Sequence, residues 1–183
     1  MTIQIAVLGA ESTGKSILIA ELLAPLAALQ PRPIWAVPEV LRQFCVEHNR
    51  APFAKEQSGI LDRQIAVERA AIAESQNTTA ILLSDCAPIT TAIYSVMYFS
   101  DASLMAMATQ HHQRYQLSLV LSPDIGWHAD PLPFMRDGPS AQLQFHQQLL
   151  DWLNVSRMPY QLIAGQGTIR TQRALDAIIK SIR

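Results

Sequence analysis

The sequence has little of what marks a secreted, membrane-spanning or nucleic-acid-binding protein. Its 183 residues include two cysteines, Cys45 and Cys86, too few for a disulfide framework and without metal-ligand spacing. No apolar run is long enough for a membrane-spanning helix. The net charge is −1 and there is no long Lys/Arg run, so nothing favours binding to nucleic acid or to an anionic membrane. The N-terminus carries no basic segment with a cleavage site, and we expect a cytoplasmic protein.

What the chain does contain is typical of one globular domain spanning residues 1–183. Apolar residues make up 49% of it and charged residues 16%. Apolar runs of strand length lie at 3–8, 34–37, 78–85, 116–124 and 160–165. Between them are segments with helical spacing, at 15–29 (kinked or cut short at Pro25), 41–47, 54–75, 141–153 and 169–182, and one or two helices are expected between 85 and 116. This alternation predicts an α/β fold with a parallel sheet flanked by helices.

The clearest motif is GAESTGKS, residues 9–16, which has the Walker A form G-x-x-x-x-G-K-[ST]. It follows an apolar strand and opens a helix, as a P-loop must. Its glycines let successive backbone N–H groups point inward at a phosphate, and the helix adds its positive end. Lys15 is expected to reach the β- and γ-phosphates and Ser16 to ligate Mg²⁺. The motif predicts ATP or GTP binding by Gly9, Ala10, Glu11, Ser12, Thr13, Gly14, Lys15, Ser16 and Ile17.

Three acidic residues follow predicted strands, and should therefore lie on the same rim as the P-loop. Glu39 is our candidate for the general base of a phosphoryl transfer, and Asp85 for a group on the metal or the substrate hydroxyl. Asp124 lies in Ser-Pro-Asp, a sequence that is also common in turns, so this acid is either part of the rim or part of a turn. Arg42 shares a helix face with Glu39, where it either binds a substrate phosphate or pairs with Glu39.

The segment 126–138, GWHADPLPFMRDG, is irregular and rich in proline. A kinase needs a part that closes over the phosphates and often brings an arginine to the transferred group, and Arg136 fits that role. Trp127 is placed to stack on a flat ring and Asp130 to face a cationic one. The histidines form no recognisable ligand set, so we expect them to be structural.

Five segments resemble, in order and spacing, the ribosylnicotinamide kinase domain of NadR-type proteins. They are AVLGAESTGKS, VPEVLRQF, ILLSDCAPITTAIYSVMYF, YQLSLVLSPDIGWHADPLPFMRD and YQLIAGQGTIRTQRALDAI. The resemblance covers nearly the whole chain and implies a P-loop kinase fold with a five-stranded parallel sheet and a lid. It also implies ATP and Mg²⁺ as cofactors and phosphorylation of the ribose 5′-hydroxyl of nicotinamide riboside.

Carried over by position, the resemblance assigns roles to the residues that match its motifs. Lys15 and Ser16 would hold the nucleotide phosphates and Mg²⁺, while Glu39 and Asp85 would face the riboside. Arg170, in GQGTIR, would lie near the adenine.

The resemblance also assigns Trp127 and Asp130 to the nicotinamide pocket and Arg136 to the lid. The chain departs from the family pattern at three points. The family often has D-T-D where this chain has Asp-Cys-Ala at 85–87, and commonly has Tyr where this chain has Val40. A second lid arginine is missing from DGPSAQLQF.

The sequence is compatible with three functions. The first is a kinase for nicotinamide riboside, and the second is a kinase for another nucleoside with a changed base pocket. The third is a regulatory P-loop ATPase in which hydrolysis switches a partner interface, with no small-molecule acceptor. The expected partner is a small nucleoside in the first two cases, and the oligomeric state is left open.

Overall fold

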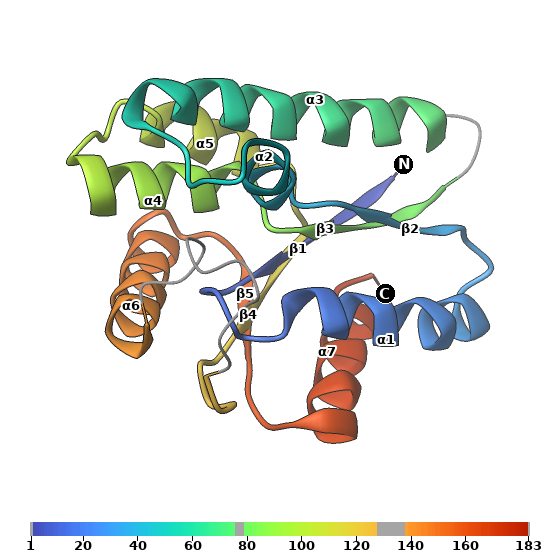
Figure 1. The fold of residues 1–183 in the computed structure, drawn as a ribbon. Helices are drawn as coiled ribbons and strands as arrows, with labels where there is room; N and C mark the ends of the chain where they lie inside the picture. Colours follow the sequence, from blue (N-terminus) through green and yellow to red (C-terminus); the bar gives the residue numbers. More distant parts are fainter. Residues whose placement is uncertain (1, 76–78, 128–137, 183) are drawn as a thin grey trace.

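A computed structural model describes residues 2–75, 79–127 and 138–182 of the chain (Figure 1). Its centre is a five-stranded, fully parallel sheet with the strand order β2-β3-β1-β4-β5. The strands are β1 (Ile3–Leu8), β2 (Ile34–Val37), β3 (Ile81–Asp85), β4 (Leu117–Leu121) and β5 (Tyr160–Ile163). With its flanking helices, this sheet confirms the predicted α/β P-loop fold class.

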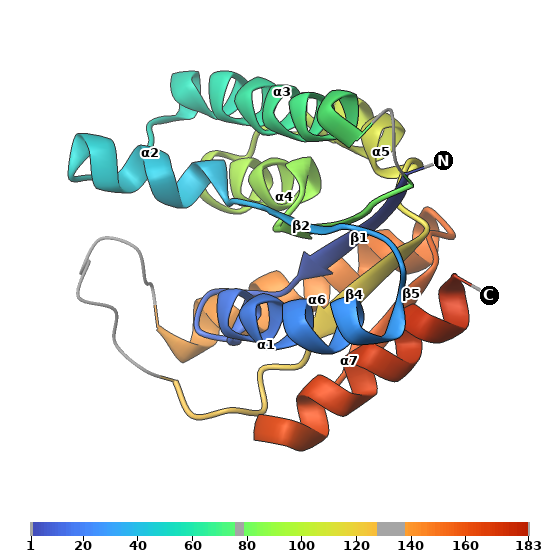
Figure 2. The same ribbon diagram turned by 90° about the vertical axis from the view of Figure 1, so that its right-hand side faces the viewer.

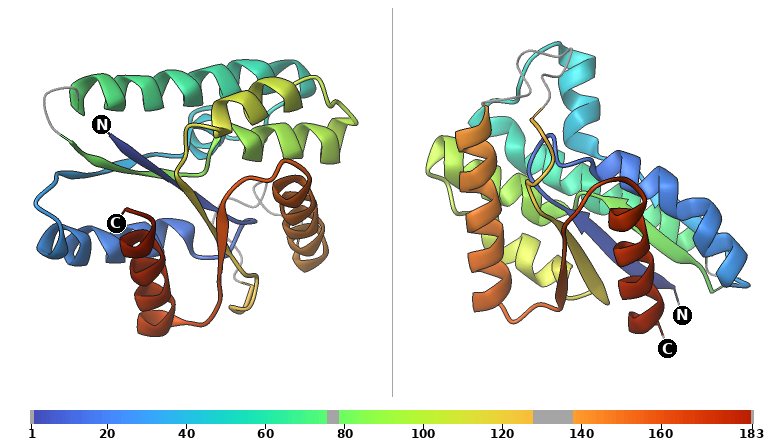
Figure 3. Two further views of the ribbon diagram at one scale, coloured as in Figure 1. Left: turned by 180° about the vertical axis from the view of Figure 1, so that it is seen from behind. Right: turned by 90° about the horizontal axis from the view of Figure 1, so that it is seen from below.

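Helices cover both faces of the sheet, as parallel strands require. Helix α1 (Lys15–Leu29) and helix α7 (Gly167–Ser181) lie together against one face (Figure 2). The other face carries α3 (Gln57–Glu74), α4 (Pro88–Phe99), α5 (Met105–His112) and α6 (Pro139–Val155). The views in Figure 3 show the same two layers from behind and from below.

The alternation of side chains along β1 divides the core between these layers. Ile5 and Val7 pack with α1 and α7, whereas Ala6 and Leu8 pack with the helices of the opposite layer. All four side chains are completely buried. A central strand buried on both faces reads as a continuous apolar run, and that is how β1 was identified from sequence.

Several predicted boundaries need adjustment. The helix expected at 54–75 divides into a short 3₁₀ helix, Ala54–Glu56, and α3. Helix α1 is not cut short at Pro25 but continues to Leu29, because Leu22 and Leu26 on either side of the proline are fully buried and hold the last turns against the sheet. Strands β3 and β4 are shorter than their apolar runs. Within the described ranges, no helix is long and apolar enough to cross a membrane.

Candidate functional site

The P-loop connects β1 to α1 and depends on two glycines. Gly14 caps α1 in the left-handed region at φ 79°. A Cβ on Gly9 would lie 2.7 Å from Thr13 Oγ1, closer than atoms can pack. The buried Thr13 hydroxyl donates a hydrogen bond to the Ala10 carbonyl at 2.7 Å, and Lys15 Nζ donates to the same oxygen at 3.0 Å. Two side chains of the loop thus bond to its own backbone, and the Lys15 ammonium lies beside the Ala10 carbonyl.

The remaining predicted loop residues take different positions. Ser12 lies in the left-handed region at φ 60°. The Glu11 carbonyl accepts a hydrogen bond from Gln142 Nε2 of α6 at 2.8 Å, so α6 fixes this side of the loop. Ile17 is 66% exposed in the first turn of α1. Its side chain is open to solvent, and a contact with the nucleotide at Ile17 stays a prediction.

The predicted acids meet beside the P-loop. Asp85 ends β3 and pairs in register with Val7 of β1, so its carboxylate reaches Ser16, whose hydroxyl donates to Asp85 Oδ2 at 2.5 Å. Glu39 follows β2, the neighbour of β3 in the sheet. Ligand atoms of Glu39, Asp85 and Cys86 all lie within 4.8 Å of one another. The structure thus brings Ser16, Glu39 and Asp85 into one group, as the strand-end rule predicts.

Cys86 is part of this group, although its sequence position gave no functional signal. It adopts a left-handed backbone at φ 66°, which is uncommon for a residue other than glycine. Its N–H donates to the Val7 carbonyl at 3.1 Å, and its sulfur lies within 4.8 Å of a carboxylate oxygen of Glu39. Burial, followed by the negative charge of Glu39, raises the pKa of the thiol well above its ordinary value. Cys86 is therefore a neutral thiol beside Glu39.

The electrostatics of the group favour a proton acceptor at Glu39. Burial is the main cause that raises the pKa of Glu39, and the nearby Asp85 carboxylate adds to it, while Lys15 opposes both. Burial acts to lower the pKa of Lys15, but the surrounding negative groups, Glu39 and Asp85 among them, raise it on balance. Lys15 remains an ammonium ion on the P-loop, near enough to Glu39 for its charge to lower the pKa of that carboxyl.

Ser16 and Asp85 fit a bound Mg²⁺. Asp85 Oδ1 is buried and has no hydrogen-bond partner among the described residues, while Oδ2 touches the Ser16 hydroxyl. Mg²⁺ prefers hard oxygen ligands and is commonly held by one or two carboxylates together with substrate phosphates. The Cys86 sulfur is a poor ligand for this ion, which leaves the oxygens of the group as its ligands.

A buried glutamine of α3 anchors the segment that carries Glu39. Gln64 Oε1 accepts the N–H of Val40 at 2.9 Å, and Gln64 Nε2 donates to the Pro38 carbonyl at 3.4 Å. These bonds hold both neighbours of Glu39 at the start of α2 (Val40–His48). Arg42 in the first turn of α2 lowers the pKa of Glu39, which places its positive charge near that carboxylate. Whether it also contacts a substrate stays a prediction.

An aromatic cavity adjoins the P-loop at Glu11. Trp127 lines it, as do Tyr94 and Tyr98 of α4 and Phe145 of α6. The two tyrosine rings stack at 5.8 Å between centroids, and Tyr94 also meets Phe145 at 4.6 Å. The signal in the sequence for this cavity wall is the i, i+4 spacing of the two tyrosines on the helix that follows Asp85. The cavity holds about 10 Å³, so an aromatic base would enter only if a wall side chain moved aside.

Two predicted residues, Asp130 and Arg136, lie outside the described residues. The cationic-ring contact of Asp130 and the lid role of Arg136 therefore stay predictions. Trp127, the last described residue before them, lines the aromatic cavity, and its contact with a nicotinamide ring stays a prediction.

Arg170, which the resemblance assigns to the adenine, lies against the P-loop backbone, and its contact with a nucleotide stays a prediction. Its side chain is 5% exposed and lies behind the P-loop. The guanidinium donates to the carbonyls of Thr13 at 2.6 Å, Gly165 at 2.6 Å and Ser122 at 3.0 Å. It also forms an ion pair with Asp124, whose other oxygen accepts the Gly165 N–H at 2.6 Å. Arg170 and Asp124 thus join the P-loop to the ends of β4 and β5 as a structural brace.

Replacing Arg170 by alanine is expected to destabilise the fold by about 2–3 kcal/mol, because buried carbonyls and the Asp124 carboxylate lose their donor. Urea unfolding followed by circular dichroism measures the loss. The matched control is Arg173→Ala on the same helix, where one exposed bond to the Ala164 carbonyl is removed and little stability should be lost. Equal losses in the two variants would contradict the role of Arg170 as a brace.

Comparisons with known proteins agree with this fold. Two solved structures of a NadR protein superpose on the chain, one in complex with NR and one in complex with NAD and AMP-PNP. The TM-scores are 0.75 and 0.73, at 18% and 17% sequence identity. Each match covers 98% of this chain and, respectively, 51% and 49% of the NadR chain, so this chain spans about half the length of those proteins.

The predicted resemblance to NadR-type proteins is therefore confirmed at the level of the fold. No curated protein matches the sequence. A family profile described as AAA domain matches residues 4–171, from β1 into α7. That match includes the P-loop, both strand-end acids and the Arg170 brace, and the chain belongs to the AAA domain family.

Proposed function

We propose that this protein is an ATP-dependent kinase that phosphorylates the ribose 5′-hydroxyl of nicotinamide riboside or of a related nucleoside. One observation carries the proposal: the P-loop residues Lys15 and Ser16 lie in one group with the strand-end acids Glu39 and Asp85. A donor site for phosphate and a candidate proton acceptor for a hydroxyl are thus within reach of each other.

In the proposed reaction the bond between the terminal phosphoryl group of ATP and ADP breaks, and ADP is the leaving group. The phosphoryl group bonds to the 5′-oxygen of the nucleoside, and the hydroxyl proton goes to Glu39. Glu39 suits this step because its raised pKa makes it a better proton acceptor than an ordinary carboxylate. Lys15 stabilises negative charge on the transferred phosphoryl group. Ser16 and Asp85 would hold Mg²⁺, which supplies positive charge to the phosphate oxygens.

The aromatic cavity is the proposed place for the base of the acceptor. Trp127, Tyr94 and Tyr98 offer aromatic faces, and a cationic ring such as nicotinamide is attracted to such faces. Asp130 and Arg136 keep their predicted roles here, as an acid facing the ring and a lid arginine. The solved NadR structures with NR and with AMP-PNP support this choice of acceptor and nucleotide.

A second candidate is a regulatory P-loop ATPase without a small-molecule acceptor. Two observations favour it. Cys86 stands where the family often has the middle Thr of D-T-D, and Ala87 replaces the second acid. The aromatic cavity is also narrow, at about 10 Å³.

One experiment separates the two candidates. Purified protein is incubated with ATP and Mg²⁺, and ADP release is followed with nicotinamide riboside, with uridine, with adenosine and with no acceptor. We expect release that depends on nicotinamide riboside or on one of the other nucleosides. ADP release at the same rate without an acceptor would reject the kinase and favour the ATPase.

A further inference from the structure

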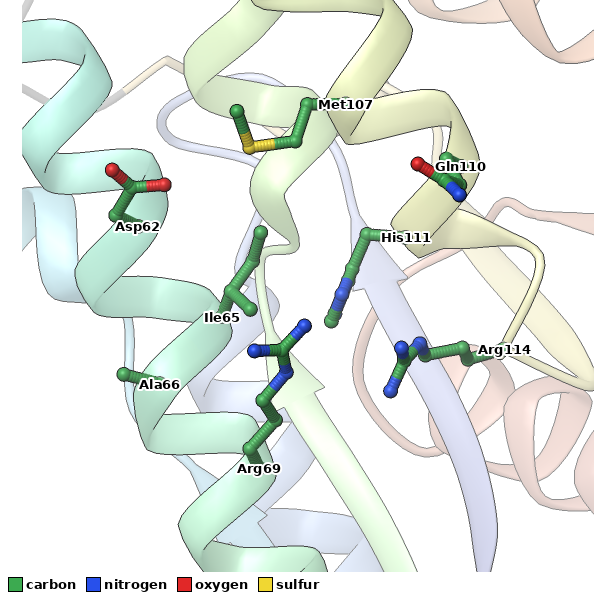
Figure 4. Close-up of a pocket in the computed structure, with 8 residues that line it drawn as sticks. All are labelled: Asp62, Ile65, Ala66, Arg69, Met107, Gln110, His111 and Arg114. Atoms are coloured by element: carbon green, nitrogen blue, oxygen red, sulfur yellow. The ribbon is translucent and has the colours of Figure 1, made fainter.

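A second cavity lies between α3 and α5, away from the P-loop (Figure 4). Its volume is about 660 Å³, within the range of roughly 300–1,000 Å³ that is common for small-molecule sites. It is lined by Asp62, Ile65, Ala66, Arg69, Met107, Gln110, His111 and Arg114. None of these residues belongs to the P-loop or to the group around Glu39. Arg114 precedes β4, so this cavity extends toward the amino ends of the strands, whereas the P-loop follows a carboxyl end.

Two arginines, Arg69 and Arg114, contribute positive charge to the cavity. Figure 4 shows Arg69 of α3 and Arg114, just after α5, extending into the space between the two helices. Neither guanidinium forms an ion pair with any residue in the ranges 2–75, 79–127 and 138–182. By contrast, Arg63 on the same helix pairs with Glu47 at 3.2 Å, and Arg50 pairs with Glu56 at 2.7 Å.

The charge of the lining favours an anion. Two guanidiniums that share one cavity repel each other, and the single acid that lines it, Asp62, offsets only one of them. A planar guanidinium matches the paired oxygens of a phosphate or a carboxylate. Ile65, Ala66 and Met107 add apolar wall beside the arginines, which suits a ligand with a small apolar body.

The floor of this cavity is connected to Glu39 through buried hydrogen bonds. His111 Nε2 pairs with Glu68 Oε2 at 2.6 Å, and both side chains are at most 5% exposed. Glu68 Oε1 accepts from Gln64 Nε2 at 3.3 Å. Gln64 Oε1 in turn accepts the N–H of Val40, the residue after Glu39. A shift of His111 would therefore displace Glu68 and Gln64, and with them the backbone N–H of Val40 beside Glu39.

We propose that the cavity between α3 and α5 binds a small organic phosphate or carboxylate through Arg69 and Arg114, and that its occupancy is transmitted to Val40 and Glu39 through His111, Glu68 and Gln64. The concave shape favours a small molecule over an anionic protein segment. This site is independent of the proposed kinase reaction, because binding requires neither turnover nor the P-loop.

The test is a titration of the ¹⁵N-labelled protein, saturated with AMP-PNP and Mg²⁺, with inorganic phosphate in one arm and succinate in the other. The nucleotide analogue blocks phosphate binding at the P-loop. We expect at least one probe to bind with a Kd of about 1 mM or tighter at low salt. Arg69→Gln and Arg114→Gln should each weaken binding about tenfold, and the matched control Arg63→Gln should leave it unchanged. The arm that binds identifies the headgroup as phosphate or carboxylate.

The amide resonance of Val40 reports the connection to Glu39. It should move during the titration of the native protein and stay in place in Arg69→Gln. Absence of binding in both arms, or binding that is the same in both arginine variants, would overturn the site. Binding that leaves the Val40 amide unchanged would overturn the connection to Glu39.

Discussion

Replacing Glu39 by glutamine is expected to lower kcat for phosphoryl transfer by about 10²–10⁴-fold, the usual contribution of a general base. Glutamine keeps the shape of the side chain, but its neutral amide cannot take the hydroxyl proton. Nucleotide binding should change little, because Lys15 and the P-loop backbone are untouched. Initial rates with saturating ATP and acceptor, together with the Kd for AMP-PNP, measure both effects.

The pH dependence gives a second measure of the same residue. Burial raises the pKa of Glu39, so its carboxylate becomes protonated at a higher pH than an ordinary glutamate. As the pH falls through that raised pKa, the base is lost and kcat/KM should fall with it. The acid limb of the profile should therefore lie above the ordinary pKa of glutamate and be absent in Glu39→Gln.

Glu47→Gln is the matched control, because Glu47 lies on α2, the helix that Glu39 caps, and pairs with Arg63 at the surface. This variant should keep the native rate and the native acid limb. A change of only a few-fold in Glu39→Gln would move the role of base to Asp85 or remove it from the mechanism. An acid limb that persists in Glu39→Gln would assign that limb to another group.

The sequence predicted the framework because the framework depends on local patterns. The apolar run of β1, the Walker A glycines and the helical spacing of α1 are encoded within about 30 consecutive residues. The strand-end rule then placed Glu39 and Asp85 on the P-loop rim without knowledge of any contact. All strands of a parallel sheet have their carboxyl ends at one edge. The position of Glu39 and Asp85 directly after predicted strands was therefore enough to place them at that edge.

The parts that could not be predicted depend on contacts between distant segments. Gln142 is 131 residues from Glu11, and Arg170 is 157 residues from Thr13. Arg170 was expected near the adenine because the resemblance to NadR-type proteins implies it. Position in the sequence indicates which edge of the sheet a residue lies on, but not the direction of its side chain. Here the guanidinium of Arg170 points into the protein and donates to backbone carbonyls that are buried away from water.

The position of Cys86 beside Glu39 could not be predicted from the sequence either. A cysteine beside Asp85 carries no motif, and by composition alone it is a reduced, buried residue. Its left-handed backbone belongs to the turn that follows β3, and its position beside Glu39 depends on the neighbouring strand β2. The sequence contains both residues, but only the sheet order β2-β3 brings them together.

Replacing Lys15 by alanine is expected to lower kcat/KM for ATP by about 10²–10³-fold, the cost of removing one preorganised donor from the transferred group. Loss of this ammonium also removes the positive charge that lowers the pKa of Glu39. The pKa of Glu39 should therefore rise further, and the acid limb of the residual activity should move to higher pH. Steady-state kinetics over a pH series measure both changes in one variant.

Two controls separate charge from shape. Lys15→Arg keeps the positive charge next to Glu39 and Asp85, so the acid limb should stay near its native position even where the larger guanidinium reduces the rate. Lys55→Ala removes a lysine of the 3₁₀ helix Ala54–Glu56, outside the group, and should change neither quantity. A Lys15→Ala variant with the native acid limb would show that Lys15 and Glu39 are not electrostatically coupled. Because the P-loop and Glu39 come from different strands, that coupling is the most direct evidence in solution that donor site and base form one catalytic group.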